Sequence, residues 1–368
     1  MAGHGDQGLR TAHADSSAGL GTDAEAQPYG RPGREAAEDQ VLAPGATRAI
    51  AGGRRTVAEE PDPWRTCFER DRDRILHSAA FRRLAGKTQV FVFPADHQRT
   101  RLSHALEVAQ VATGIAQACR LNVALTEAIA LGHDCGHGPG GHMSEDALGI
   151  FLPGGFDHAV WGADVSVANL NLCEETLDGI RNHSWSRPAP ITPEGEVVSW
   201  ADRIAYVCHD FEDAVMSGIV TPSALPQLVR ERCGDQRSQQ LGTFIDAMVS
   251  AILSSGRIGM ADAQAEALAA FRASNYEHIY LRPSSVAQGR SVVGVLQALV
   301  EHFGDRPNLI PVGGGRTTDL TGGEPLAVRE AVAYVAGMTD RFAFGQAVAL
   351  LGWDPDKLPV GIGVTRRL

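Results

Sequence analysis

The chain has 368 residues, more than one average domain, and its 43% of hydrophobic residues is enough for a large buried core. The formal net charge of -11 disfavours a broad nucleic-acid or membrane-binding surface, although an acidic protein can still hold a local basic pocket. The sequence has no signal-like segment and no long apolar run, so we expect a soluble, unexported, cytoplasmic protein with no membrane partner. The six cysteines are scattered and form no CxxC pair, which predicts reduced core thiols.

Residues 1–55 are rich in Gly, Ala, Asp, Arg and Pro and have almost no aliphatic periodicity. Such a segment cannot bury enough apolar surface to offset the entropy of ordering, so we expect a disordered tail. A helical apolar stripe follows over residues 67–84, and residues 89–93 then predict a strand or an extended turn. A small hairpin there would be the only notable β structure.

The rest of the chain is helical by its apolar period. One helix is predicted over residues 103–119, and another over 123–134 ends at the glycine-rich sequence CGHGPGG. Further helices are predicted at 164–182, 197–217, 241–254, 261–273, 286–303 and 325–351. We therefore predict an all-α protein with a tail over 1–55, a core over 56–220 and a C-terminal helical region over 221–368 packed on that core.

Two histidines and two carboxylates stand out in separated stretches: His104 in RTRLSHALEV, His133 and Asp134 in LGHDCGHGPGGH, and Asp202 in SWADRIAYVCHD. Imidazoles and carboxylates in this order can close around one divalent cation and leave positions open for water and substrate. A lone His-Asp pair is weak evidence, because a histidine at a helix C-terminus is favourable without any metal. Asp202 strengthens the case, since an unpaired carboxylate in an apolar helix would be costly. Together these residues predict a hydrolytic metal site.

The loop after His133 and Asp134 carries three more titratable side chains, His137, His142 and Glu145. Beside a cation, such groups suit proton transfer to a leaving oxygen or orientation of an attacking water. The competing interpretation is that the histidines only satisfy loop carbonyls. For His142 and Glu145, three residues apart, we favour catalysis, while for His137 both interpretations stay open.

Basic residues near the first histidine are candidate phosphate ligands, because arginine offers a fixed bidentate fork for phosphate. Arg101 lies three residues before His104 and is preferred, since this spacing ties it to the metal site. Arg99 is expected to face water. Weaker candidates lie in the segment FRRLAGK: Arg82, Arg83 and Lys87.

The predicted helix over residues 197–217 carries a polar stripe at intervals of four, four and three residues: Asp202, Tyr206, Asp210 and Asp213. These intervals place all four side chains on one helix face. A polar stripe on an otherwise apolar helix usually indicates a site, although a solvated face has the same pattern.

With these residues in view, the chain resembles the HD-domain superfamily and, within it, the deoxyguanosine triphosphate triphosphohydrolases (dGTPases) and related dNTP triphosphohydrolases. The resemblance spans residues 64–350 and rests on five segments in the family's order: RDRDRILHSAAFRRLAGKTQVF, TRLSHALEVAQVATGIA, LTEAIALGHDCGH, WADRIAYVCHDFEDAV and YVAGMTDRFA. It implies a multi-helix HD fold whose metal-dependent phosphohydrolase core is the predicted core over residues 56–220.

The resemblance implies the family's metal ligands at four positions: His104, His133, Asp134 and Asp202. It implies a catalytic pair followed by two neighbouring active-site histidines: His142 and Glu145, then His137 and His158. The implied cofactor is a divalent cation, and such a ligand set does not distinguish among Mg, Mn, Co, Ni, Fe and Zn.

Substrate contacts are implied in the same way. Gln89 and Asp210 match positions that read the deoxyribose 3'-hydroxyl, and Tyr206 matches a tyrosine that packs against the sugar where a 2'-hydroxyl would clash. Arg101 and Arg203 match phosphate contacts. The implied reaction is attack at the α-phosphorus of a dNTP, with dGTP favoured, which releases a deoxynucleoside and tripolyphosphate.

Two other functions stay open: an HD-type phosphohydrolase acting on another nucleotide, such as a monophosphate, and a catalytically weakened nucleotide-binding regulator. His142 and Glu145 disfavour a pure binder, because binding alone needs no acid/base pair. Nucleic acid is not expected as a substrate, and the family also allows a homo-oligomer.

The chain departs from the family pattern beside the implied site. Gly140 replaces the aromatic residue of the glycine loop, which removes a packing anchor and adds backbone freedom. In the next motif Ala159 replaces an asparagine, Trp161 a glutamine, and Asp164 an arginine. An indole and a reversed charge near the pocket would alter base preference, substrate size, oligomer contacts or activity.

Overall fold

The structure is a computed structural model that describes residues 3–5, 8–19, 21, 28–50, 53–94, 97–311 and 319–360. Over these residues it consists of helices, helical turns and loops, with β structure limited to isolated bridges. The all-α prediction is therefore confirmed. The segment 89–93 contains no strand, and the nearest β pairing is a single bridge between Thr88 and Thr100.

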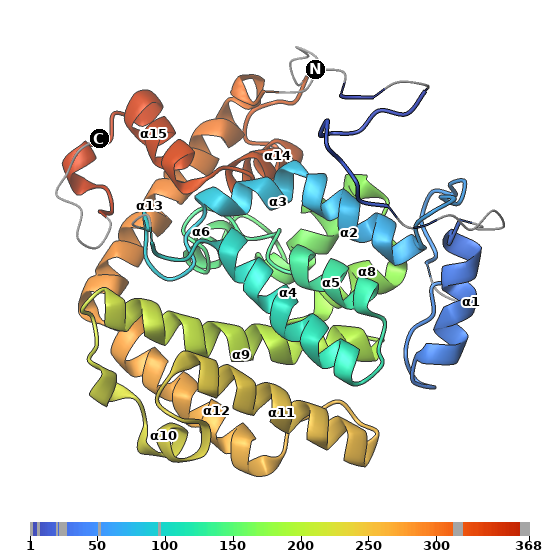
Figure 1. Cartoon of the computed structure of the whole chain (residues 1–368). Coiled ribbons are helices and arrows are strands. Elements are labelled where there is room, and N and C mark those ends of the chain that lie inside the picture. Colours follow the sequence, from blue (N-terminus) through green and yellow to red (C-terminus); the bar gives the residue numbers. More distant parts are fainter. Residues whose placement is uncertain are drawn as a thin grey trace.

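The described helices follow the chain in two groups (Figure 1). The first comprises α1 (Arg31–Val41), α2 (Cys67–His77), α3 (Ala79–Arg83), α4 (Arg101–Ala118), α5 (Val123–Gly132), α6 (Met143–Gly149), α7 (His158–Trp161), α8 (Glu174–Asn182) and α9 (Pro193–Met216). The second comprises α10 (Gln227–Cys233), α11 (Arg237–Ser255), α12 (Asp262–Asn275), α13 (Pro283–Asp305), α14 (Pro325–Ala336) and α15 (Asp340–Leu351). Among the residues that the structure describes, no helix has the length and apolarity needed to cross a membrane.

Capping residues determine where the central helices begin. Thr100 accepts a hydrogen bond from the backbone N–H of Ser103, so α4 starts at Arg101 and its first turn contains His104. Asn122 caps α5 through the N–H of Leu125. Thr192 caps α9, and Pro193 occupies its first position, where a missing N–H costs nothing.

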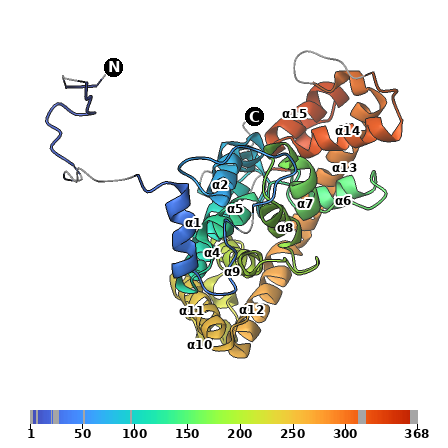
Figure 2. The ribbon, with the colours of Figure 1, turned by 90° about the vertical axis from the view of Figure 1, so that its right-hand side faces the viewer.

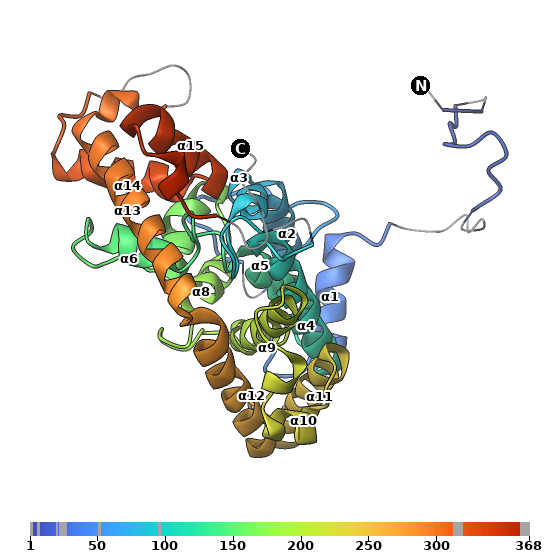
Figure 3. The same cartoon turned by 90° about the vertical axis from the view of Figure 1, so that its left-hand side faces the viewer.

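Two hydrophobic clusters make up most of the core. In the first, α4 packs against α5 and α9, and α2 and α8 pack against α5. The second joins α13, α14 and α15 to α6. Figure 3 shows α13 running from the end of α12 to α14 and α15. This helix therefore connects the helices around the first cluster with those around the second. The polar residues of interest lie between the two clusters.

The prediction of a disordered tail over residues 1–55 is wrong for its second half. Residues 31–41 form helix α1, and Ala46 and Ala49 are buried in the first cluster. The side chain of Glu194, on α9, anchors this segment by accepting from the N–H and the hydroxyl of Thr47 at 3.0 and 2.7 Å. Hydrogen bonds to the core therefore stabilise a segment that buries little apolar surface of its own. Before α1, the described residues extend away from the helical body (Figure 2).

Three predicted helices are interrupted. Ser78 has extended backbone angles and caps α3 through the N–H of Phe81, which divides the predicted helix over 67–84. The segment 164–182 becomes helical only at Glu174, after a π-helical turn and Asn171 at φ 50°. Residues 337–339 separate α14 from α15.

A buried carboxylate joins α15 to the glycine-rich loop. Asp340, 2% exposed, accepts from the N–H and hydroxyl of Thr88 at 2.9 and 2.5 Å and from the N–H of Gly140 at 2.9 Å. Lys87 lies beside it and donates to the carbonyls of His137 and Ala336. Burial lowers the pKa of Lys87 to about 8, although the charge of Asp340 opposes this shift. The C-terminal region thus holds the loop in place.

Replacing Asp340 with Ala should lower the free energy of unfolding by about 3 kcal/mol, because the buried Thr88 hydroxyl would lose its acceptor and Lys87 would lose a favourable nearby charge. Two backbone N–H groups would also lose their acceptor. Chemical denaturation followed by circular dichroism measures the change. Asp246→Ala, at an exposed position of α11, is the matched control and should change stability by less than about 0.5 kcal/mol. Equal stabilities of the two variants would refute this role for Asp340.

Candidate active site

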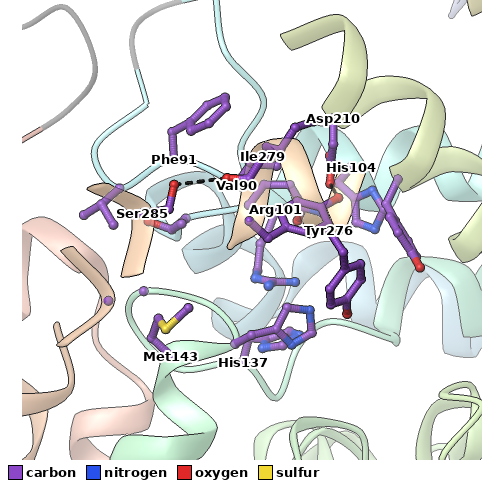
Figure 4. A pocket seen from close by; sticks show the side chains of 18 of the residues that line it. Val90, Phe91, Arg101, His104, His137, Met143, Asp210, Tyr276, Ile279 and Ser285 are labelled. Carbon is purple, nitrogen blue, oxygen red and sulfur yellow. Dashed lines mark hydrogen bonds between the residues drawn. The ribbon is translucent and has the colours of Figure 1, made fainter. Parts of the chain in front are cut away.

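A cavity of about 830 Å³ lies between the two hydrophobic clusters. Its walls come from the 88–92 loop, the first turn of α4, the glycine-rich loop, α9 and the segment 272–293. Figure 4 shows Arg101, His104, His137 and Asp210 around this space. Its volume suits a small-molecule ligand.

The structure brings the four predicted metal ligands together at the base of the cavity. His104 Nε2 lies 3.0 Å from Asp202 Oδ1, and His133 Nε2 lies 3.7 Å from the same oxygen. Asp134 Oδ1 is 3.4 Å from His133 Nε2. His104, His133 and Asp134 are almost fully buried, while the Asp202 side chain keeps 24% exposure.

The hydrogen bonds of His133 fit a metal ligand. Its Nδ1 lies 2.7 Å from the carbonyl oxygen of Ala130, which can only accept, so Nδ1 carries the proton and Nε2 keeps a lone pair. Nε2 is buried, and no described side chain or backbone group forms a hydrogen bond with it. One ligand atom each from His104, His133 and Asp202 lies within 4.8 Å of the others. This donor set could hold a divalent cation.

Both carboxylates of this group are ionised at neutral pH. Burial opposes ionisation of Asp134, but the Arg101 guanidinium and the nearby histidines hold its pKa well below the usual range. Burial likewise opposes ionisation of Asp202, but the hydrogen bond with His104 and the charges of the neighbouring histidines together outweigh it, so the pKa of Asp202 is lowered. Two negative charges therefore lie where a cation would bind.

The glycine-rich loop, α6 and α7 bring a second set of titratable groups together. One ligand atom from each member lies within 4.8 Å of the others: His137, His142, Glu145 and His158. His158 Nδ1 hydrogen-bonds to Glu145 Oε1, and His142 Nδ1 lies 3.7 Å from the same oxygen. Burial raises the pKa of Glu145, but the two histidines together hold it well below its usual value. The side chain of His142 is 68% exposed and accessible to a ligand.

His137, in contrast, is fully buried. Its ring stacks on His158 at 3.7 Å between centroids, and its Nε2 lies 3.2 Å from Asp134 Oδ1. Burial and the charge of Arg101 hold its pKa well below 6.5, so the ring is neutral at neutral pH. This position allows His137 to orient Asp134.

Arg101 is buried yet only partly paired. One of its terminal nitrogens donates to Asp134 Oδ2 at 2.6 Å. The other terminal nitrogen and Nε have no hydrogen-bond acceptor among the described residues. A side chain at position 141 would crowd this guanidinium, since a Cβ there would lie 2.8 Å from it, and Gly141 has φ +65°. The glycine therefore leaves room for the guanidinium beside the loop.

The opposite wall carries unsatisfied acceptors. Gln89 Oε1 and Asp210 Oδ1 are buried without a donor in the part of the chain that the structure describes. The other Asp210 oxygen accepts from the hydroxyl of Tyr280 at 2.5 Å. Burial raises the pKa of Asp210 to about 7. The Tyr206 hydroxyl accepts from Arg272 Nε at 2.9 Å, which fixes the tyrosine ring in the wall.

Two arginines have other surroundings than a phosphate contact for Arg203 and solvent exposure for Arg99 would predict. Arg203 lies at the cavity, but its guanidinium stacks 3.5 Å above the ring of Trp185. Arg99 does not face water as expected. Its side chain is 12% exposed and pairs with Glu107, Glu212 and Asp213, because the turn before α4 packs against α9.

The residues that depart from the family pattern around Trp161 do not line the cavity. Trp161 is buried in the second cluster, where its ring packs 4.9 Å from Phe156. Asp164 pairs with Arg181 at the surface. Neither Trp161 nor Asp164 lines the cavity, so neither departure makes a direct contact there. Gly140 does line the cavity.

Several cavity residues were missed from the sequence: His183, Trp185, Arg272, Tyr276 and Tyr280. His183 follows α8 as His133 follows α5, so a histidine at a helix end was the available signal. Nothing in the local sequence of α12 and the turn after it indicates the cavity. Arg272, Tyr276 and Tyr280 reach it because α12 folds back along α9.

The HD domain model matches residues 101–207, and the phosphohydrolase-associated domain model matches residues 258–347. A deoxyguanosinetriphosphate triphosphohydrolase-like protein of Caldanaerobacter subterraneus is 40% identical over 316 residues, covering 84% of this chain and 92% of that protein. A protein of the same description from Clostridium perfringens is 40% identical over 303 residues, covering 77% and 86%. A hypothetical protein from Aquifex aeolicus has a similar fold, with a TM-score of 0.50, 15% identity, and coverage of 78% of this chain and 69% of that chain.

The two family models fall on the two parts that enclose the cavity. The high coverage of both relatives extends the similarity beyond the HD motif itself. The chain belongs to the deoxyguanosinetriphosphate triphosphohydrolase-like family of HD-domain proteins.

Proposed function

We propose that this protein is a metal-dependent hydrolase that converts a deoxynucleoside triphosphate, with dGTP favoured, to a deoxynucleoside and tripolyphosphate. The observation that carries the proposal is the partly unpaired Arg101 guanidinium beside the His104, His133, Asp134 and Asp202 cluster. A cation site next to free guanidinium N–H groups suits a polyphosphate. The names of the relatives support the same substrate class.

Four side chains would hold the divalent cation: His104, His133, Asp134 and Asp202. Such a cation would help to ionise an attacking water and would neutralise charge on the phosphoryl oxygens. Arg101 would bind a phosphate oxygen through its free N–H groups while keeping its contact with Asp134. His137, which is neutral and buried, would keep the Asp134 carboxylate oriented toward the cation.

His142 and Glu145 would move the proton. His142 would donate a proton to the departing 5'-oxygen. Its imidazole is accessible from the cavity and lies beside the buried His137. Glu145 would orient His142 and stabilise its protonated form. His158 would hold the Glu145 carboxylate in place from the buried side.

The wall that carries Gln89 and Asp210 would bind the sugar. Both offer buried acceptors without donors, which a 3'-hydroxyl would satisfy. Tyr206, fixed by Arg272, would pack where a 2'-hydroxyl would otherwise fit. These contacts support a deoxyribonucleotide over a ribonucleotide.

Asp202→Ala should remove bound metal and turnover together, since it deletes a carboxylate that faces both histidines. We expect metal affinity to fall by more than about 100-fold. Elemental analysis after dialysis and tripolyphosphate release from dGTP measure the two effects. Asp246→Ala serves as the control. Normal metal content with full activity would contradict the ligand assignment.

The His142→Ala variant should keep the metal, but its hydrolysis rate should fall by about 10²- to 10⁴-fold, because only the proton donor is removed. Metal content and the rate under saturating dGTP are measured on the same preparation. His77→Ala, an exposed histidine at the end of α2, is the control. An unchanged rate would make His142 an ordinary loop residue.

The enzyme should hydrolyse dGTP with a kcat/KM at least about 10-fold above that for GTP, and Tyr206→Ala should narrow this ratio. Rates on dNTPs, NTPs and nucleoside monophosphates, with products identified, give the comparison. The exposed Tyr29→Ala variant should keep the wild-type ratio. Equal rates on dGTP and GTP would refute the sugar assignment. Orthophosphate from a monophosphate would indicate a different nucleotide phosphohydrolase.

A further inference from the structure

A second cavity, of about 420 Å³, has no role in the proposed function. Its walls come from α3, the segment 161–170 and the end of α14, and it shares no lining residue with the candidate active site. Lys87 and Cys135 also line it, which brings the second cavity next to the glycine-rich loop.

Two candidate phosphate ligands of the segment FRRLAGK, Arg83 and Lys87, line the second cavity and do not line the candidate active site. Lys87 is 3% exposed. Its ammonium group donates to the carbonyl oxygens of His137 and Ala336, so one of its three N–H donors has no acceptor among the described residues. A buried N–H donor of a charged group is therefore available to a ligand.

The guanidinium of Arg83 is also unpaired, since no described residue forms an ion pair or hydrogen bond with it. It lies against the end of α14, because a Cβ on Gly337 would be 3.2 Å from Arg83 Nη1. Burial lowers the pKa of Lys87 to about 8, and the charge of Arg83 acts in the same direction. Asp340 opposes this shift but does not line the second cavity, and no acidic side chain does among the described residues.

The other polar groups of the wall can donate hydrogen bonds. Ser78 Oγ accepts from the N–H of Phe81, which leaves the hydroxyl proton available, and Ser166 and Asn169 add a hydroxyl and an amide. Trp161 lines the second cavity as well, so this departure from the family pattern changes the second cavity instead of the candidate active site. Two cations and several donors without a carboxylate suit an oxyanion.

We propose that the second cavity binds a phosphate-type oxyanion, orthophosphate or diphosphate, between Arg83 and Lys87. Its volume is about half the 830 Å³ of the candidate active site, which suits a smaller ligand of the same chemistry. The anion would accept from the remaining N–H of Lys87 and hold this side chain in place. Because Lys87 donates to the carbonyl oxygen of His137, the bound anion would stabilise the glycine-rich loop.

Isothermal titration calorimetry of the full-length protein with orthophosphate and, separately, with diphosphate tests the binding. Arg83→Gln removes the guanidinium from the second cavity, whereas Arg82→Gln is the matched control, because Arg82 is exposed and lines neither cavity. We expect Arg83→Gln to weaken the affinity for the ligand by at least about 10-fold and Arg82→Gln to change it by less than about 2-fold. The anion with the larger loss is the ligand, and any phosphate bound at Arg101 would be kept in both variants.

Equal affinities of the wild type and Arg83→Gln would overturn the second site, since the anion would then bind elsewhere. Equal weakening in Arg82→Gln would also overturn it, because surface charge alone would explain the binding, and so would a wild type that binds neither anion. If Arg83→Gln does not fold, Ala333→Leu fills the second cavity without changing its charge and should give the same loss.

Amide hydrogen exchange tests the effect on the loop. With the anion at saturation, exchange of residues 136–142 should slow in the wild type and in Arg82→Gln, but not in Arg83→Gln. Anion binding without slower exchange would refute the link to the loop. Neither measurement needs turnover, so their failure leaves the proposed function intact, and an absence of dGTP hydrolysis would leave the anion site intact.

Discussion

The buried charge of Asp134 constrains everything around it. An ionised carboxylate at this depth is tolerated only when several partners compensate it. Arg101 from α4 pairs with one oxygen, while His133 and His137 face the other. These partners bring together the start of α4, the end of α5 and the glycine-rich loop, so one electrostatic requirement determines how three segments meet at the cavity.

Three histidines at the cavity lie at or directly after the ends of helices, so little loop structure separates them from the helical core. His104 lies in the capped first turn of α4, and His133 and His183 directly follow α5 and α8. At both of the latter positions the last turn of the helix supplies a carbonyl that fixes the imidazole tautomer. The same backbone geometry therefore orients a nitrogen lone pair twice, toward neighbouring points in one cavity.

The sequence predicted the all-α fold and a set of polar residues that line the cavity, because helical period, glycine content and ligand types are local signals. It could not predict residues whose position depends on long-range packing. Tyr280 reaches Asp210 only after α12 folds back along α9, and Trp161 packs into the second hydrophobic cluster and does not line the cavity. Helix α1 was missed for a related reason, since the apolar pattern that predicts helices is weak in a segment held by the buried Glu194.

The glycine-rich loop links catalysis to the C-terminal region. Gly140 has φ +75°, and a Cβ there would lie 2.4 Å from Val292 Cγ1, so α13 fills the space that a loop side chain would occupy. The N–H of Gly140 is tied to Asp340 on α15. With the aromatic anchor gone, packing by α13 and hydrogen bonding by α15 remain to position the loop that carries His137 and His142. The phosphohydrolase-associated region, residues 258–347, therefore contributes to the structure of the cavity wall.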